Sequence, residues 1–422
     1  MLSQGTIAIL IFIVVMILII WGKIHRTAAA VGGAVLLFLC GIMTVEEGVS
    51  HIDFNTIGVL VGMMLFVAVV KKSGIFEAIA IKAARLAGGD PWRIMVAFMI
   101  ITALLSAFLD NVTTVLLIGP MTIAITSALR IDPVPFLMTQ ILASNIGGTA
   151  TLIGDPPNIM LGSAADLSFM EFLEHNGPVT AIILAATIMC FRFLYRKQIM
   201  VDKRVMERVM RLEEGRVIKD RGLLAKSVAV SILVVAGFLL HDALGVETSV
   251  VALTAAVIML VIGRQNVEEV ISDVEWSTIV FFIGLFILVG GLVETGVMGG
   301  LADMILSLTG GRAIATMMLI LWASALLSST LDNIPFVATM IPLILSMEAA
   351  GMDGVPLWWA LSLGSCLGGN GTLIGASANV VMAGVSERNG HPITYLEFLK
   401  VGFPLMIMSI IICSIYLLIR FA

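Results

Sequence analysis

Two aspartates lie inside long apolar stretches of the chain, each in the same local sequence. Residues 103–111 read ALLSAFLDN and residues 325–333 read ALLSSTLDN, which places Asp110 and Asp332 at matching positions. An ionised carboxylate in a lipid-covered segment costs roughly 2.5–3.5 kcal/mol or more, so it needs a partner, a cation or a proton. We therefore predict a functional role for both aspartates. Capping of a following helix is an alternative that is compatible with ion binding, because Asp is a good N-cap.

A second duplicated motif interrupts two other apolar runs with glycines, hydroxyls and amides. Residues 144–158 read SNIGGTATLIGDPPN and residues 365–379 read SCLGGNGTLIGASAN. We expect a break in the helix there, and unwound backbone at membrane depth is tolerated only where it is buried in protein or lines a cavity. Its free carbonyls, with Thr, Ser and Asn oxygens, suit a hard cation. Nearby helix N-termini suit an anion or a polar solute.

The two motifs define a predicted binding site near the middle of the membrane. Asp110, Asp155 and Asp332 are the candidate coupling residues, because a buried carboxylate can exchange a proton for a cation. We expect no catalytic residue and no cofactor other than a bound Na+. The candidate ion- or substrate-binding residues are Ser106, Asp110, Asn111, Thr114, Asn145, Thr149, Thr151, Gly154, Asp155, Asn158, Ser328, Asp332, Asn333, Asn370, Thr372, Ser377 and Asn379.

The elements that position these motifs are predicted to be membrane-spanning helices. Of 422 residues, 59% are hydrophobic and 13% are charged, a balance that would leave a water-soluble protein covered with apolar surface. The apolar residues gather in stretches of about 20, the length of a helix that crosses a bilayer. Five full spans are predicted in each half, at residues 5–22, 27–43, 54–71, 134–163 and 176–195, and at residues 224–241, 247–263, 276–292, 356–385 and 402–420.

The matching motifs indicate that the chain is a duplication. An odd number of spans in each half would place the second copy upside down relative to the first. We therefore predict an all-α polytopic protein of two inverted-topology repeats, residues 1–195 and 224–422, joined by a basic linker at 196–223. An extra apolar segment in each repeat, at 92–129 or 312–347, is predicted to be a re-entrant hairpin broken at the Leu-Asp-Asn. If each broken segment instead crossed the membrane, adding one crossing to each half, the chain would cross twelve times and the repeats would be parallel.

Lys and Arg predict the orientation, because basic residues that flank spans stay on the cytoplasmic side. The polar stretch at 196–221 is rich in both and is predicted to be cytoplasmic. Lys23 and Arg26 are assigned to the same side, which leaves both termini outside. The opening stretch is interpreted as the first span rather than a signal peptide, because no basic segment precedes it. The expected location is the cell membrane, and the net charge of −5 gives no basic face for nucleic acid.

The motifs resemble those of a known group of transporters. The two Leu-Asp-Asn tips and GTATLIGDPPN at 148–158 are similar to the ArsB/NhaD group of the ion transporter superfamily. That group includes arsenite permeases, NhaD-type Na+/H+ antiporters and the melanocyte P protein branch, and it is distantly related to divalent anion/sodium symporters. The resemblance implies an elevator-type architecture, in which a scaffold domain dimerises and a transport domain carries both hairpins and both loops. It also implies Na+ at Ser106, Asp110 and Asn111 and at Ser328, Asp332 and Asn333.

Motifs and resemblance together predict a secondary active ion transporter that works by alternating access. Na+/H+ antiport and arsenite or antimonite efflux are the two expected activities. A sodium-coupled citrate-like or dicarboxylate carrier is the alternative, although the hairpin-tip aspartates would repel a dianion unless a cation or proton neutralised them. An arsenite pump would need a separate soluble ATPase subunit, because the chain has no Walker-type phosphate-binding loop.

Two further classes of protein fit the sequence less well than a transporter. Paired aspartates can run hydrolysis when they share a site, but duplication of the whole motif around both aspartates suits symmetric ion sites better than an intramembrane enzyme. Broken helices in both halves favour alternating access over the open pore of a channel. The expected partners are therefore the lipid bilayer, a small ion or solute and a second copy of the chain.

Overall fold

The computed structural model describes residues 3–196, 199, 201, 206–207, 210, 217–218 and 220–422, and these form helices without strands. Most basic residues of the predicted cytoplasmic loop lie outside the described residues. The first half contains α1 (Gln4–Trp21), α2 (Arg26–Leu39), α3 (Val45–Ser50), α4 (Phe54–Lys71), α5 (Ile75–Leu86), α6 (Pro91–Ser106), α7 (Asn111–Leu129), α8 (Val134–Thr149), α9 (Pro156–Ala165) and α10 (Phe169–Tyr195). The second contains α12 (Arg221–Leu240), α13 (Thr248–Gly263), α14 (Val267–Ser272), α15 (Trp276–Glu294), α16 (Val297–Thr309), α17 (Ala313–Ser328), α18 (Asn333–Ala349), α19 (Val355–Gly368), α20 (Ser377–Arg388) and α21 (Tyr395–Phe421).

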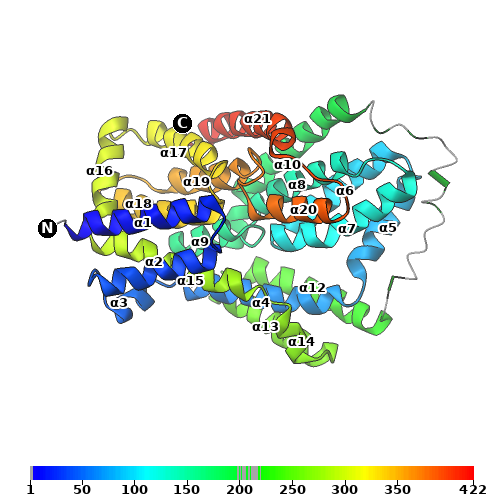
Figure 1. Ribbon diagram of the computed structural model, residues 1–422, viewed down its shortest axis with the longest axis horizontal. Helices are drawn as coiled ribbons and strands as arrows, with labels where there is room; N and C mark the ends of the chain where they lie inside the picture. Colours follow the sequence, from blue (N-terminus) through cyan, green and yellow to red (C-terminus); the bar gives the residue numbers. More distant parts are fainter. Residues whose placement is uncertain are drawn as a thin grey trace.

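The helices of the two halves correspond in order, from α1 with α12 to α10 with α21. Their contacts correspond as well. A Cβ added to Gly62 on α4 would lie 2.6 Å from the backbone of Ala252 on α13, and one added to the equivalent Gly284 on α15 would lie 2.8 Å from the backbone nitrogen of Val31 on α2. Figure 1 places α5 at one end of the molecule and its counterpart α16 at the other. This arrangement is what two inverted repeats predict, so the predicted fold class is confirmed.

Capping side chains mark the starts of several helices, and those of α10 and α21 are equivalent in the two halves. Asp90 accepts a hydrogen bond from the backbone of Arg93 at the start of α6. Ser168 and Glu171 form a capping box at α10, and Thr394 and Glu397 form the same box at α21. Each box satisfies two backbone N–H groups that have no partner within the helix. The sequence therefore fixes where the long final helix of each repeat begins.

The predicted spans at 134–163 and 356–385 are each two helices separated by a break. α8 continues through Thr149 and α19 through Gly368, so the breaks are shorter than the predicted loops at 144–158 and 365–379. Glycine is retained in α8 because the backbone of α6 lies against it: a Cβ on Gly147 would lie 2.1 Å from the Ala103 carbonyl oxygen. Pro156 then begins α9, where a proline is tolerated because its missing N–H would have had no partner.

Length and composition distinguish several kinds of helix. Seven of the described helices are long and apolar enough to cross a membrane: α1, α4, α7, α10, α12, α15 and α21. The predicted spans at 27–43 and 247–263 are helices of 14 and 16 residues. Sequence analysis missed α5 and α16, which precede the two hairpins. α16 meets the following α17 at 116°, so this hairpin is entered through a sharp turn.

The helices form two packed groups that both halves share. We call α1, α2, α4, α12, α13 and α15 the scaffold group, because α4 packs along α13, α2 along α15, and α1 and α12 against this set. We call α6 to α10 and α17 to α21 the hairpin group, in which α6 packs on α8, α17 on α19, α7 on α20 and α18 on α9. In Figure 1, α2, α4, α12, α13 and α15 lie along the lower side of the molecule. The hairpin tips therefore lie inside one group and face the other.

Close backbone packing makes Gly62 a test of the scaffold group. We expect Gly62→Ala to lower stability by about 1–3 kcal/mol, the usual cost of overpacking, because the new Cβ would meet backbone atoms of Ala252 and Leu253. Thermal unfolding of the purified protein in detergent measures this. Gly299→Ala on α16 is the matched control, because its Cβ would have no neighbour within 4 Å. Equal melting temperatures for the two variants would contradict the packing account.

Candidate functional site

At the tip of each hairpin, an aspartate caps the second of the hairpin's two helices. Asp110 Oδ1 accepts a hydrogen bond of 2.8 Å from the backbone N–H of Thr113 at the start of α7. Asp332 Oδ1 accepts one of 3.3 Å from the backbone N–H of Ile334 at the start of α18. The capping alternative therefore holds at both tips. Because capping uses one carboxylate oxygen, each aspartate keeps a second oxygen for another partner.

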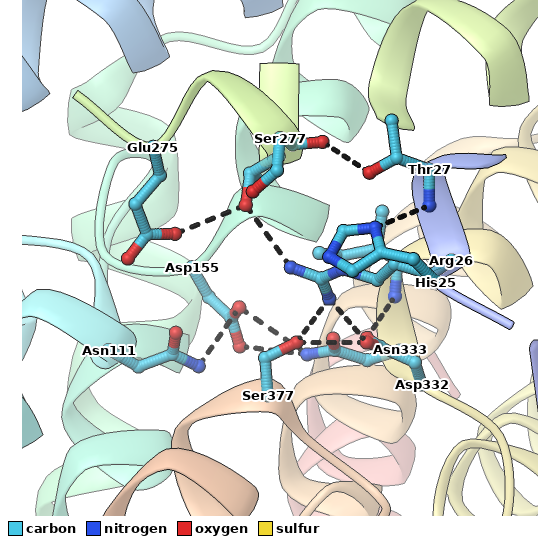
Figure 2. A network of polar contacts seen from close by, with 12 residues as sticks. His25, Arg26, Thr27, Asn111, Asp155, Glu275, Ser277, Asp332, Asn333 and Ser377 are labelled. Carbon is cyan, nitrogen blue, oxygen red and sulfur yellow. Dashed lines mark hydrogen bonds and ion pairs between the residues drawn. The ribbon is translucent and has the colours of Figure 1, made fainter. Parts of the chain in front are cut away.

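Asp155 is buried between the two hairpin tips, with 1% of its surface exposed. The Asn111 side-chain amide donates to its Oδ1 at 3.2 Å, and the Asn333 amide donates to its Oδ1 and Oδ2 at 3.3 and 3.2 Å. Figure 2 shows the Asp155 carboxylate between these two amides. Asn111 and Asn333 are equivalent residues of the two repeats, so both repeats hold one central carboxylate. The counterpart of Asp155 in the second repeat is Ala376, which avoids a second buried acid there.

Buried asparagines link the tips to the broken helices. Asn111 also donates to Asn145 Oδ1 at 3.3 Å. The Asn145 amide donates to Asn370 Oδ1 at 2.9 Å and to Asn379 Oδ1 at 3.0 Å. The structure thus brings together five of the predicted site residues from both repeats: Asn111, Asn145, Asn333, Asn370 and Asn379.

Other predicted site residues hold the shape of the breaks. The Asn158 amide donates to the carbonyls of Gly148, Thr149 and Thr151, and its counterpart Asn379 donates to the carbonyls of Gly369 and Thr372. The Thr151 hydroxyl donates to the Ala107 carbonyl, and the Thr372 hydroxyl donates to the Ser329 carbonyl. The Thr149 hydroxyl donates to the Asn145 carbonyl. In this structure, these hydroxyls and amides donate hydrogen bonds to backbone carbonyls. The bonds of Thr151 and Thr372 connect each break to its hairpin tip.

In each repeat, carbonyl oxygens of the break and of the hairpin tip lie close to one glycine of the break. A Cβ on Gly154 would lie 2.5 Å from the Ser106 carbonyl oxygen and 2.7 Å from that of Gly148. A Cβ on Gly375 would lie 2.9 Å from the Gly369 carbonyl oxygen, with the carbonyls of Ser328 and Ser329 within 3.1 Å. These contacts show that the backbone of each break packs directly against the backbone of its hairpin tip.

The hydroxyls near the tips differ between the repeats. Ser106 and Thr114 are buried, and their hydroxyls have no hydrogen-bond partner among the residues that the structure describes. The Ser328 hydroxyl donates to the Ser365 carbonyl at 2.7 Å. A buried hydroxyl without a partner is costly, and a bound cation would remove that cost. Among the described residues, no group of three His, Cys, Asp or Glu could hold a metal ion.

A small cavity lies where the tips face the scaffold group. Its volume is about 20 Å³, which is room for one water molecule or a dehydrated ion. Asp110, Asp155 and Glu275 line it, together with Arg26 and Ser377. The volume of this cavity in the present structure is too small to hold an organic acid.

Arg26 is a site residue that sequence analysis missed. Its guanidinium donates to Ser377 Oγ at 2.7 Å, to Asp332 Oδ2 at 3.1 Å and to Thr278 Oγ1 at 3.1 Å, and it lies 5.1 Å from the ring centre of Phe281. Figure 2 shows these bonds converging on Arg26 from both helix groups. In the sequence Arg26 serves only as an orientation marker, because a lone basic residue before an apolar helix is typical of a membrane flank.

Glu275 is the second residue that sequence analysis missed. It directly precedes α15, and its carboxylate accepts a hydrogen bond of 3.1 Å from Thr278. No motif marks Glu275, because its counterpart before α4 is an aspartate, Asp53. The two acids lie at equivalent positions in the fold, directly before α15 and α4. Arg26 is already paired with Asp332. Asp110, Asp155 and Glu275 therefore give the cavity more carboxyl groups than basic groups among the described residues.

The central hydrogen bonds predict a stability effect at the tips. Asn333→Ala removes a donor from the buried Asp155 carboxylate, so we expect a loss of about 1–3 kcal/mol. Thermal unfolding in detergent measures it. Asn389→Ala removes a hydrogen bond to the Val385 carbonyl at an exposed position, where water can replace it, and should change stability less. An Asn333→Ala protein as stable as this control would show that Asp155 does not depend on the tip amides.

Comparisons with known proteins agree with this architecture. The CitMHS citrate transporter family model matches residues 16–364. An uncharacterised transporter of Mycobacterium bovis is 45% identical over 426 residues, which cover 99% of each chain. The P protein of Homo sapiens is 33% identical over 502 residues, which cover 99% of this chain and 60% of the P protein.

A solved structure shares the fold. The crystal structure of the Alcanivorax borkumensis YdaH transporter aligns with a TM-score of 0.60 and 15% identity, and the alignment covers 99% of this chain and 98% of that one. At this identity the likeness shows the fold alone. The resemblance to ArsB/NhaD-related ion transporters is confirmed. The chain is a multi-pass membrane transporter and belongs to the citrate transporter family.

Proposed function

We propose that the protein is a secondary transporter that exchanges a small cation, Na+ in the first instance, for protons. The observation that carries this proposal is the excess of carboxyl groups that line the cavity. Asp110, Asp155 and Glu275 line a space of about 20 Å³, while the positive charge of Arg26 is offset by Asp332. A site with excess carboxylates and room for one small species favours a cation or a proton over an anion.

The proposed exchange follows from competition at the carboxylates. An ionised carboxylate out of water requires a compensating charge, which a cation or a proton can supply. A dehydrated Na+ would take oxygens from Asp110, from the unpartnered hydroxyls of Ser106 and Thr114, and from the carbonyls around Gly154. Protonation of the same carboxylates weakens cation binding, so the two ions would leave on opposite sides when the site alternates in access.

The division into two helix groups supports an elevator-type movement as the means of alternation. The hairpin group would carry the site, and the scaffold group would stay fixed and hold the dimer contact. We place residues 196–221 on the cytoplasmic side and both termini outside the cell membrane. The proposed repeats are residues 1–195 and 224–422, with 196–223 as the linker between them.

A citrate-like anion is the second candidate, because the family model is that of a citrate transporter and Arg26 brings a guanidinium to the cavity. Anion binding would require Arg26 to leave Asp332 and the cavity to enlarge. Arsenite is a third solute to test: arsenous acid is small and uncharged, so the carboxylates do not repel it. Its active export would need a separate ATPase subunit.

Flux in proteoliposomes tests the proposal. We expect addition of Na+ or Li+ to change the internal pH of vesicles that hold the purified protein. Asp155→Asn should reduce the rate at least tenfold, because it removes the central carboxylate, and Asp110→Asn and Asp332→Asn should also slow it. Asp303→Asn, at an exposed position of α16, is the matched control and should keep the wild-type rate.

Two arms of the same experiment distinguish the alternatives. Labelled citrate uptake without a cation-driven pH change would contradict cation exchange and favour the anion carrier. Arsenite accumulation alone would favour the efflux carrier.

A further inference from the structure

The two repeats make unequal contacts where the scaffold group meets the hairpin group. In the first repeat, Ser163 on α9 donates to Asp53 Oδ1 at 2.9 Å and receives a bond of 3.4 Å from the Asn55 amide. Asp53 and Asn55 lie at the start of α4, in the scaffold group. The equivalent position in the second repeat is the start of α15, beside which α2 begins with Arg26. There the contact with α20 is made by Arg26, whose guanidinium donates to Ser377, the first residue of α20, at 2.7 Å.

The difference between these contacts is a shift along a helix. Ser163 corresponds to Gly384 on α20, whereas Ser377 corresponds to Pro156 at the start of α9. The start of α4 therefore contacts α9 about two helical turns further along the helix than Arg26 contacts α20, which is ~10 Å at a rise of about 1.5 Å per residue. Part of this offset is the length of the Arg26 side chain, so the hairpin group is displaced from the symmetric position by at most about half of that distance.

Two equivalent crevices show the same asymmetry. The crevice between α15 and α18, lined by Phe286, Val289 and Ala338, has a volume of about 380 Å³. Its counterpart between α4 and α7, lined by Met64, Val67 and Leu116, has a volume of about 110 Å³. One side of the boundary between the groups is thus more open than the other.

We infer that Arg26 is the latch that holds the present state of the proposed elevator-type movement, in which the hairpin group slides by at most ~10 Å along the scaffold group. In the second state the two repeats exchange their contacts, so Ser277, the counterpart of Asn55, faces Gly384. Arg26 then leaves Asp332 and Ser377. This inference rests on the proposed alternating transport and adds to it a positioning residue and a defined pair of end states.

Arg26 is suited to this role because its bonds cross the boundary. It begins α2 in the scaffold group, while Asp332 and Ser377 belong to the hairpin group. Thr278 and Phe281 on α15 hold the guanidinium from the scaffold side. The repeat-equivalent pair is Thr248 and Asp110, and a threonine cannot form an ion pair. The second state therefore has no ion pair that matches the one between Arg26 and Asp332. The hydrogen bonds of Ser163 to Asp53 and Asn55 also belong to the present state, because the counterpart of Ser163 is Gly384.

Disulfide cross-linking in proteoliposomes tests the inference without any transported ion. The background replaces Cys40, Cys190 and Cys413 by Ala and Cys366 by Ser, so that the hydrogen bond of the Cys366 thiol to Asn158 keeps a donor. Asn55→Cys with Ser163→Cys reports the present state. Ser277→Cys with Gly384→Cys reports the second state, and a side chain at 384 has open space. Asn55→Cys with Gly384→Cys is the control for random collision.

In the protein that keeps Arg26, we expect the 55/163 pair to link and the 277/384 pair to link weakly. Arg26→Thr, which copies the residue of the other repeat, should raise the 277/384 to 55/163 ratio about tenfold, equivalent to about 1.4 kcal/mol. Arg26→Lys keeps the charge and should raise it less. Asp332→Asn should act like Arg26→Thr.

Each failure has a separate meaning. If the 277/384 pair links no more than the collision control in every variant, the inferred second state is wrong. If it links equally in the protein that keeps Arg26 and in the Arg26→Thr variant, Arg26 is not the latch. A shifted ratio in protein that shows no cation-driven pH change would instead overturn Na+/H+ exchange and leave the latch intact. Size-exclusion profiles of each variant separate these results from misfolding.

Discussion

The Asp155 carboxylate, held between the amides of Asn111 and Asn333, is the interaction on which the rest of the site depends. A buried carboxylate is costly unless donors or a positive charge compensate it. The two hairpin tips supply those donors from equivalent positions, so the site exists only when both tips meet. Because Ala376 takes the matching place in the second repeat, the symmetric fold carries one central charge instead of two that would repel.

The meeting of the tips in turn requires backbones to approach closely. Gly147 and its counterpart Gly368 let α8 and α19 lie directly against the carbonyls of Ala103 and Ala325. The same packing brings carbonyl oxygens together around Gly154, where a side chain would collide with them. Small residues at these positions thus combine two effects, close helix packing of the kind membrane proteins use and a cluster of oxygens suited to a cation.

Sequence patterns predicted the duplicated motifs, the hairpin tips and the start of α4 at Phe54, because local repeats and apolar runs are visible in one dimension. They did not predict that α8 stays helical through Thr149, which depends on packing against α6. They also missed Arg26, whose partners lie on distant elements, and Glu275, which only the fold brings to the same cavity as Asp110 and Asp155. In the sequence, Arg26 is typical of a basic residue that flanks a membrane span. Only the fold shows that it is paired with Asp332, which lies 306 residues away in the sequence.

Equilibrium binding of radioactive Na+ to the purified protein over a range of pH tests the central claim most directly. The account predicts saturable binding that weakens as the pH falls, since protons compete for the same carboxylates. It also predicts that Asp155→Asn abolishes this binding while Asp303→Asn leaves it unchanged. Saturable citrate binding with no Na+ binding at any pH would contradict the account.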